Sequence, residues 1–226
     1  MVWLRELGEV DGSTKIPMKF DIRIIGIDIV REMCVKYHPY ASAGGRATYA
    51  FGVFENDICV ASFAWQPPPF GAAKSVCPEF PNGVLALSRM VAVPRSERAL
   101  KHISKPLMVQ MKKLIDRTRW PVLITYSDSS VGHTGYVYQC SGWEKTLSRS
   151  TNVFVDSTGA RVSSYQNGVV APRSRSGVAE IQRWENWACA RGSAKQFVEM
   201  HGWKVVPIFG KVWASGRQAH TVIKNT

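Results

Sequence analysis

A run of polar side chains follows a short apolar segment near the middle of the chain. Residues 121–126 are almost all apolar, and Asp128, the turn 132–135 (Gly-His-Thr-Gly) and Tyr138 come directly after them. In open α/β sheets the ligand lies beyond the carboxyl ends of the strands. A carboxylate, an imidazole and a phenol at such a strand end are groups that general acid and general base catalysis use. We therefore expect a functional site here.

Asp128 and Tyr138 each have a catalytic and a structural interpretation. The Asp128 carboxylate can orient an amine and accept its proton, or it can cap the turn that follows the strand. The Tyr138 hydroxyl can donate to a leaving group or an oxyanion, or it can hydrogen-bond to the main chain inside the core. We favour the catalytic role for Asp128, and both interpretations of Tyr138 stay open.

Two residues outside this segment are also able to contact a ligand. Arg89 lies in the apolar run 84–93, where an unpaired charge is costly to bury, so we expect it to reach a ligand or to pair with Asp128. Ser104 is expected to be the N-cap of a helix, and a capped N-terminus that faces a cleft is also an anion site.

Two histidines lie in predicted loops. His38 and His133 are each able to act as a base near neutral pH. Together with Asp128 they form an alternative site, a triad of two imidazoles and one carboxylate of the kind that holds iron. The spacing of the three residues is not a metal-binding signature, so the principal interpretation includes no metal.

The elements that position these residues are expected to be both strands and helices. Hydrophobic periodicity and turn residues predict strands or hairpins at 48–55, 58–65, 84–93, 121–126, 153–163 and 204–213. They predict a strand running into a helix over 20–37, an irregular stretch at 66–82, and helices at 104–115, 136–141, 178–190 and 193–200.

This order of elements predicts an α+β fold with one mixed, mostly antiparallel central sheet that helices flank. The 226 residues are compatible with one domain, and too little chain follows the polar loop 165–177 to make a second core. We expect a single domain over 1–226, with flexible ends at 1–19 and 215–226.

The charge of the chain favours a polyanionic partner. Lys and Arg number 29 against 17 Asp and Glu, which gives a formal net charge of +12 and an isoelectric point of about 9.7. Each Lys or Arg set against a phosphate releases condensed counterions. Much of the positive charge is concentrated in one segment, where the candidate DNA-binding residues are Arg95, Arg98, Lys101, Lys105, Lys112 and Lys113.

The cysteines and the lengths of the apolar runs indicate the cellular compartment of the protein. The five cysteines show no Cys-x-x-Cys spacing, which argues against a disulfide framework and a zinc cluster and favours a reducing compartment. No apolar run approaches the roughly 20 residues needed to span a bilayer. We expect a soluble protein of the cytoplasm that has no membrane partner.

Several of these segments resemble the phage Mom DNA-modification proteins, which are similar to the GNAT (N-acetyltransferase) superfamily. The similarity covers roughly residues 20 to 214. The most specific segment is the string from Tyr126-Ser127-Asp128 to Gly142-Trp143. Weaker matches are Tyr37-His38 before a small-residue loop, Leu87-Ser88-Arg89, Ser104, and the closing segments 201–203 and 210–213.

The resemblance implies a GNAT-like fold and a transferase that acts on DNA. Such an enzyme converts the N6 amine of adenine in double-stranded DNA to a carbamoylmethyl (acetamido) form, and this hides the phage genome from restriction enzymes in the cytoplasm of the bacterial host. On this interpretation the candidate catalytic residues are Tyr37, His38, Arg89, Ser104, Asp128 and Tyr138, and the candidate donor-binding residues are Arg89, Arg98, Lys101 and Ser104.

The resemblance leaves two donors open, acetyl-CoA or another activated small group. Most acetyltransferases of the superfamily hold the pyrophosphate of CoA on main-chain N–H groups of a Gly-rich loop. The equivalent segment here, 94–104, contains no glycine, so its affinity for an anion has to come from basic side chains and from the amides near Ser104. Two other functions remain alternatives: an acyl-CoA-dependent N-acetyltransferase of a protein, tRNA or small molecule, and a non-catalytic DNA-binding module.

Overall fold

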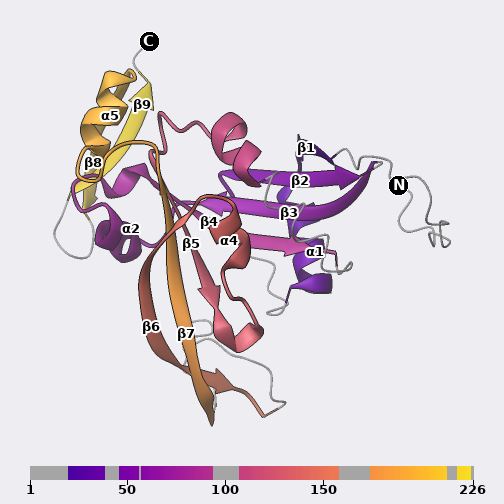
Figure 1. Cartoon of the computed structure of the whole chain (residues 1–226). Helices are drawn as coiled ribbons and strands as arrows, with labels where there is room; N and C mark the ends of the chain where they lie inside the picture. The colour runs from indigo at the N-terminus through magenta and orange to yellow at the C-terminus, as the bar shows by residue number, and fades with distance from the viewer. Residues whose placement is uncertain are drawn as a thin grey trace.

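The computed structural model of the chain describes residues 20–38, 46–55, 57–93, 107–157, 174–212 and 218–224. Figure 1 shows how the elements are arranged. In chain order they are β1 (Phe20–Ile24), α1 (Ile27–Tyr37), β2 (Tyr49–Glu55), β3 (Ile58–Gln66), α2 (Phe70–Val76), η1 (Pro81–Gly83), β4 (Val84–Ala92), η2 (Gln110–Leu114), β5 (Val122–Asp128), η3 (Ser129–Val131), α4 (Tyr136–Cys140), β6 (Glu144–Val155), β7 (Ser174–Trp187), α5 (Ala194–Met200), β8 (Trp203–Val212) and β9 (Gln218–Lys224).

Seven strands form the central sheet, in the order β1-β2-β3-β4-β5-β7-β6. Neighbouring strands are antiparallel except β4 and β5, which are parallel. β8 and β9 form a separate antiparallel pair. The predicted α+β class, with a mixed and mostly antiparallel central sheet flanked by helices, is confirmed.

The middle of the sheet, around β3, β4 and β5, is buried on both faces. Leu85 of β4 packs with Leu107 and Tyr138 on one face, whereas the next residue, Ala86, packs with α2 on the other. α1 covers the same second face further along β4, where Val91 belongs to its core cluster. Because both faces are covered, β4 and β5 are apolar over their first halves, as expected for a parallel pair.

The parallel pair separates after three residues. β4 and β5 are paired only at Val84 with Val122, Leu85 with Leu123 and Ala86 with Ile124. Both strands continue beyond this point, β4 to Ala92 and β5 to Asp128. The carboxyl halves of the two strands therefore border a gap in the sheet.

One predicted helix is wrong, because residues 178–190 fall largely in the long strand β7. Apolar residues three apart, such as Val178, Ile181 and Trp184, imitate a helical stripe. The alternation that a strand shows is masked by Glu185, a buried carboxylate that is only 1% exposed and lies 2.9 Å from the guanidinium of Arg183. A buried charge that is paired inside the fold therefore interrupts the alternation of apolar and polar residues by which a strand is recognised.

Three other segments differ from the sequence-based expectations. The stretch 66–82 contains the helix α2 and the short helix η1. β6 begins at Glu144, well before the predicted strand, and pairs with β7, while the predicted hairpin partner at 161–163 lies outside the described residues. The strand β9 lies within the end that was expected to be flexible.

The helices in the described part of the chain are short. Residues 107–109 are α-helical and continue into η2, a π-helix, so the described part of the predicted helix 104–115 is helical. None of the described helices is long and apolar enough to cross a membrane.

Candidate active site

A cavity of about 640 Å³ lies at the gap between β4 and β5. Residues 86–92 of β4 and the end of β5 form its walls, and residues 132–138 of the following turn and α4 close one side. The carboxyl end of α1 and the segment between β3 and α2 contribute the rest. The gap thus has the position that sequence analysis predicts for a ligand, beyond the paired part of the strands.

Most of the predicted site residues within the described ranges lie together. The cavity is lined by Tyr37, His38, Arg89, Asp128, His133 and Tyr138. The other candidates, Arg95, Arg98, Lys101, Ser104 and Lys105, fall outside the described residues. Lys112 and Lys113 are exposed on η2 and do not line the cavity.

A β-bulge in β4 sets the positions of Ser88 and Arg89. Ala64 of β3 faces Arg89 and Trp65 faces Leu87, so Ser88 is the extra residue on β4. Its hydroxyl donates to the carbonyl of Ala64 at 3.0 Å, and Arg89 Nη1 donates to the carbonyl of Ser88 at 2.7 Å. Bulges beside active sites commonly redirect a side chain in this way.

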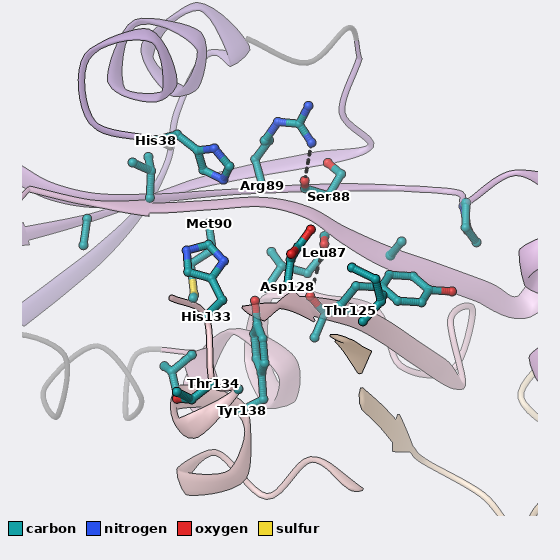
Figure 2. A pocket seen from close by; sticks show the side chains of 18 of the residues that line it. His38, Leu87, Ser88, Arg89, Met90, Thr125, Asp128, His133, Thr134 and Tyr138 are labelled. Carbon is teal, nitrogen blue, oxygen red and sulfur yellow. Dashed lines mark hydrogen bonds between the residues drawn. The ribbon is translucent and has the colours of Figure 1, made fainter. Parts of the chain in front are cut away.

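The two charged residues of the cavity lie on different sides of β4. Figure 2 shows Arg89 and His38 on one side of the strand, and Asp128 and Tyr138 on the other. In this view the Arg89 guanidinium points away from the Asp128 carboxylate. The cavity has a positively charged side and a side that carries a carboxylate and a phenol.

Asp128 performs the structural role that its position predicts. Its Oδ1 accepts hydrogen bonds from the main-chain N–H of Ser130 at 2.9 Å and from the Ser130 hydroxyl at 2.7 Å. It is therefore the N-cap of η3, and the same side chain lines the cavity. The cap is confirmed, while the catalytic role stays a prediction.

Tyr138 is a buried phenol whose hydroxyl reaches the cavity. Its side chain is 7% exposed and packs against the rings of Trp143 and Trp184, with centroids 5.9 and 6.0 Å away. In Figure 2 the hydroxyl points from α4 toward the strand that carries Leu87. Burial raises the pKa of Tyr138, and a hydrogen bond with Thr125 opposes that rise. The phenol is protonated at neutral pH and can donate a hydrogen bond.

The two histidines approach each other at one end of the cavity. Their ring centroids are 6.3 Å apart, nearly edge to face. Burial, then the charge of Arg89 and then His133 lower the pKa of His38 from 6.5 to about 4. Burial also lowers the pKa of His133, against the opposing charge of Asp128. The His38 imidazole is therefore neutral at physiological pH, and its lowered pKa makes it a weak proton acceptor there.

The described residues offer little support for a metal site. Among them, no group of three or more His, Cys, Asp and Glu side chains is arranged to hold a metal ion. The alternative of an iron site formed by His38, His133 and Asp128 is therefore not supported.

The sequence profile of the Mom protein family matches residues 19–208. The chain belongs to the Mom protein family. A search of curated proteins gave no match.

Solved structures similar to this member of the Mom family include three bacterial acetyltransferases. An acetyltransferase of Bacillus subtilis in complex with CoA is 8% identical, with a TM-score of 0.43 over 76% of this chain and 99% of that one. The IAA acetyltransferase of Bacillus cereus is 8% identical, with a TM-score of 0.45 over 74% and 100%. An N-acetyltransferase of Staphylococcus aureus is 10% identical, with a TM-score of 0.43 over 75% and 98%.

Some residues of this Mom-family cavity escape the sequence analysis. Thr125 and Tyr126 belong to the wall that β5 forms, and Pro68 and Pro69 approach from the start of α2. A threonine inside an otherwise apolar buried strand is a signal that could have identified Thr125. The prolines carry no comparable signal, because only the tertiary fold brings them to the end of β4.

The glycines of the Gly-His-Thr-Gly turn have different tasks. Gly132 and Gly135 both have a left-handed backbone, with φ of 75° and 78°. A Cβ at Gly135 would lie 2.2 Å from the Trp184 ring, whereas a Cβ at Gly132 would meet nothing within 4 Å. Gly135 allows α4 to approach β7 closely, and this approach places Tyr138 at the cavity.

We expect Gly135→Ala to destabilise this Mom-family chain more than Gly132→Ala. Both variants bear the cost of a left-handed alanine, roughly 1–2 kcal/mol, and only Gly135→Ala also displaces a buried indole. Urea unfolding of the two variants and the parent measures the difference. Equal losses of stability would show that the contact between Gly135 and Trp184 does not determine the packing of α4.

The environment of His38 predicts a change in stability with pH. Because its pKa is lowered from 6.5 to about 4 in the folded state, the unfolded chain binds the proton first as pH falls. His38 therefore reduces stability progressively from about pH 6.5 down to about 4. We expect His38→Gln to flatten the decline of the urea midpoint across this window. An unchanged pH profile would contradict the assignment.

The effect of the Arg89 charge on the pKa of His38 can also be tested. Arg89→Gln should raise the pKa of His38, because the guanidinium is one of the groups that lower it. Arg89→Lys keeps a positive charge and is the matched control. NMR titration of the His38 ring protons reports the pKa in both variants.

Proposed function

We propose that this chain is a transferase that converts the N6 amine of adenine in double-stranded DNA to a carbamoylmethyl form. The modification protects phage DNA from restriction enzymes in the cytoplasm of the bacterial host. The observation that carries the proposal is the cavity of the Mom-family chain, which is lined by Asp128, Tyr138, His38 and Arg89. The net charge of +12 supports a polyanionic substrate.

A donor for this product has to carry a carbamoylmethyl group with a leaving group on its methylene carbon, because acetyl transfer from acetyl-CoA would give an N6-acetyl product instead. The described residues fit the reactive end of such a molecule. Beyond Ala86, β4 no longer pairs with β5, so main-chain groups on that edge of β4 border the cavity. The bulge at Ser88 and the positive charge of Arg89 lie at the same place. When bound, the donor supplies an activated carbon for transfer to the amine.

Asp128 acts on the acceptor amine, and His38 covers the base. The N6 lone pair of adenine is delocalised into the ring, so the amine needs to be oriented and to lose a proton as it reacts. The Asp128 carboxylate, held in place by Ser130, orients the amine and accepts the proton. The neutral imidazole of His38 lies on the other side of β4 and, with Tyr37, closes the cavity over the base.

Tyr138 stabilises negative charge that develops on the donor during transfer. Burial raises the pKa of the phenol, so it keeps its proton and donates a hydrogen bond to a developing oxyanion or to the leaving group. The packing of its ring against Trp143 and Trp184 fixes the direction of the hydroxyl.

The base leaves the duplex for the reaction. N6 of a paired adenine engages thymine at the edge of the major groove. Enzymes that perform chemistry on a base commonly evert it, at a cost of a few kcal/mol. A cavity of about 640 Å³ has room for a purine and the reactive end of a donor.

Mass spectrometry of nucleosides tests the proposal directly. Plasmid DNA recovered from cells that express this chain should contain 2′-deoxyadenosine carrying an added carbamoylmethyl group on N6. DNA from cells that express the Tyr138→Phe variant is the control. An unmodified adenine pool in the presence of folded protein would contradict the proposal. Acetylated protein or tRNA in the same cells would favour an acetyltransferase with another acceptor.

Lys112 and Lys113 are the described members of the basic group that we assign to the DNA backbone. Both are exposed on η2. Replacing both with Gln should weaken binding to all duplexes alike, because phosphate contacts carry no base information. The slope of log affinity against log salt should become shallower by about two units.

Fluorescence anisotropy titrations over a series of salt concentrations measure this slope. A double variant of two exposed lysines away from η2, Lys195→Gln with Lys204→Gln, controls for the lost net charge. Equal slopes for the parent and the η2 variant would rule out phosphate contacts by these two lysines.

A further inference from the structure

Two strands continue past the central sheet as a ribbon. β5 pairs with β7 only as far as Asp128 with Ile181, whereas β6 and β7 remain paired as far as Val155 with Ser174. We call residues 150–155 and 174–180 the outer ribbon. Figure 1 shows β6 and β7 projecting together from the body of the protein. At about 3.3 Å per residue, the seven residues 174–180 extend roughly 20 Å beyond β5.

The outer ribbon presents polar side chains to solvent. Ser150 and Asn152 of β6 are exposed, as are Ser174, Arg175 and Ser176 of β7. Among the apolar residues of the ribbon, Val153 and Ala179 are buried and Val178 is exposed. A two-stranded ribbon is marginally stable by itself. Hydroxyl, amide and guanidinium groups are, however, the types that hydrogen-bond to the edges of bases.

The outer ribbon is attached to the turn that carries Asp128. The main-chain N–H of Glu180 donates to the hydroxyl of Ser129 at 2.8 Å. Ile181, the next residue of β7, lines the cavity. A molecule that lies along the ribbon is therefore held in a defined position relative to the cavity.

The acidic residue at the start of the ribbon is engaged within the protein. The Glu180 carboxylate accepts hydrogen bonds from the Ser148 hydroxyl and from Gln182 Nε2, the latter at 3.1 Å. Arg149 and Arg175 are exposed on the two strands. These two guanidinium groups supply positive charge on either strand for a polyanionic partner.

We propose that the outer ribbon enters the major groove of duplex DNA and reads the bases that flank the target adenine. The proposal rests on the proposed function, because the partner is the duplex. The major groove is about 12 Å wide and admits a two-stranded ribbon. A reach of roughly 20 Å at 3.4 Å per base pair covers about six base pairs to one side of the cavity. Arg175 is suited to guanine and Asn152 to adenine.

A selection experiment tests the proposal through binding alone. The full chain is incubated with 30-base-pair duplexes that carry a central adenine and randomised flanks, and the bound duplexes are sequenced. The parent should prefer particular bases within about six base pairs of the adenine. Arg175→Gln and Asn152→Ala should each reduce the preference at one or two of these positions about 5- to 100-fold, the effect of losing a bidentate contact to a base.

Two controls separate this role from a structural one. Lys195→Gln changes an exposed charge on α5, far from the ribbon in Figure 1, and should keep the parental preference. Ser150→Ala is a milder ribbon variant for use if Asn152→Ala does not melt like the parent. Identical base preferences in the parent and in all ribbon variants would overturn the proposal. So would ribbon variants that alter only the oligomeric state in sedimentation, since the edge of β6 would then join two copies.

Failure of the ribbon proposal can be distinguished from failure of the proposed reaction. Ribbon-dependent base preference without modified adenine would contradict the proposed reaction and leave the ribbon assignment in place. Modified adenine with no ribbon-dependent base preference would contradict the ribbon proposal and leave the proposed reaction in place.

Discussion

Tyr138→Phe should lower the rate of adenine modification by ~10²–10⁴-fold, the usual contribution of a general acid or base. The variant removes a single hydroxyl from a side chain that is 7% exposed and retains the ring that packs against Trp143 and Trp184. Because the hydroxyl is the part that reaches the cavity, the loss falls on the reaction and not on the core. The measurement is the initial rate at which modified deoxyadenosine accumulates in duplex DNA incubated with the protein and a donor.

Tyr49→Phe is the matched control for this prediction. Tyr49 lies in β2 and stacks on Phe51 with centroids 6.0 Å apart, and it is not among the residues that line the cavity. It should modify DNA at the parental rate. Thermal melting of both variants shows whether each retains the fold. A folded Tyr138→Phe with parental activity would assign the phenol to packing alone.

Several residues that line the cavity could be grouped from the sequence because they are close together in the chain. Asp128, the turn 132–135 and Tyr138 lie within eleven residues of one another, directly after an apolar strand. A strand end followed by polar residues is a local signal, and the structure places these groups beside one cavity. Tyr37 and Arg89 are further away in the chain. Tyr37 was included because it stands in a segment similar to the Mom family, and Arg89 also because a charge inside an apolar run is costly to bury.

What the sequence did not predict depends on contacts between distant residues. The bulge at Ser88 exists only in relation to Ala64 and Trp65 on β3. The strand β7 contains Glu185, whose carboxylate accepts hydrogen bonds from Thr146 and Trp187 at 2.7 and 2.8 Å. A buried charge with several partners is stable only in the folded chain, so its strand cannot be recognised from hydrophobic alternation. The direction of the Arg89 side chain relative to Asp128 also depends on the folded chain, and the sequence does not predict it.

Asp128→Asn should lower the modification rate by a similar ~10²–10⁴-fold while the protein melts like the parent. The amide oxygen of Asn can still accept the hydrogen bonds from Ser130, so the cap of η3 is preserved. What the variant loses is the negative charge and the ability to take a proton. Asn at this position therefore separates the catalytic role of Asp128 from its structural role, which Asp128→Ala would remove together.

The charge of Asp128 also has a spectroscopic signature. It raises the pKa of His133 against the effect of burial, so Asp128→Asn should lower that pKa further in an NMR titration. Ser130→Ala keeps the carboxylate and removes the hydroxyl that donates to it. This variant should retain the parental rate with a small loss of stability. If Asp128→Asn shows the shift at His133, melts normally and modifies DNA at the parental rate, then Asp128 is only a cap. If the rate falls while the shift at His133 is present, the carboxylate acts on the substrate and not through the fold.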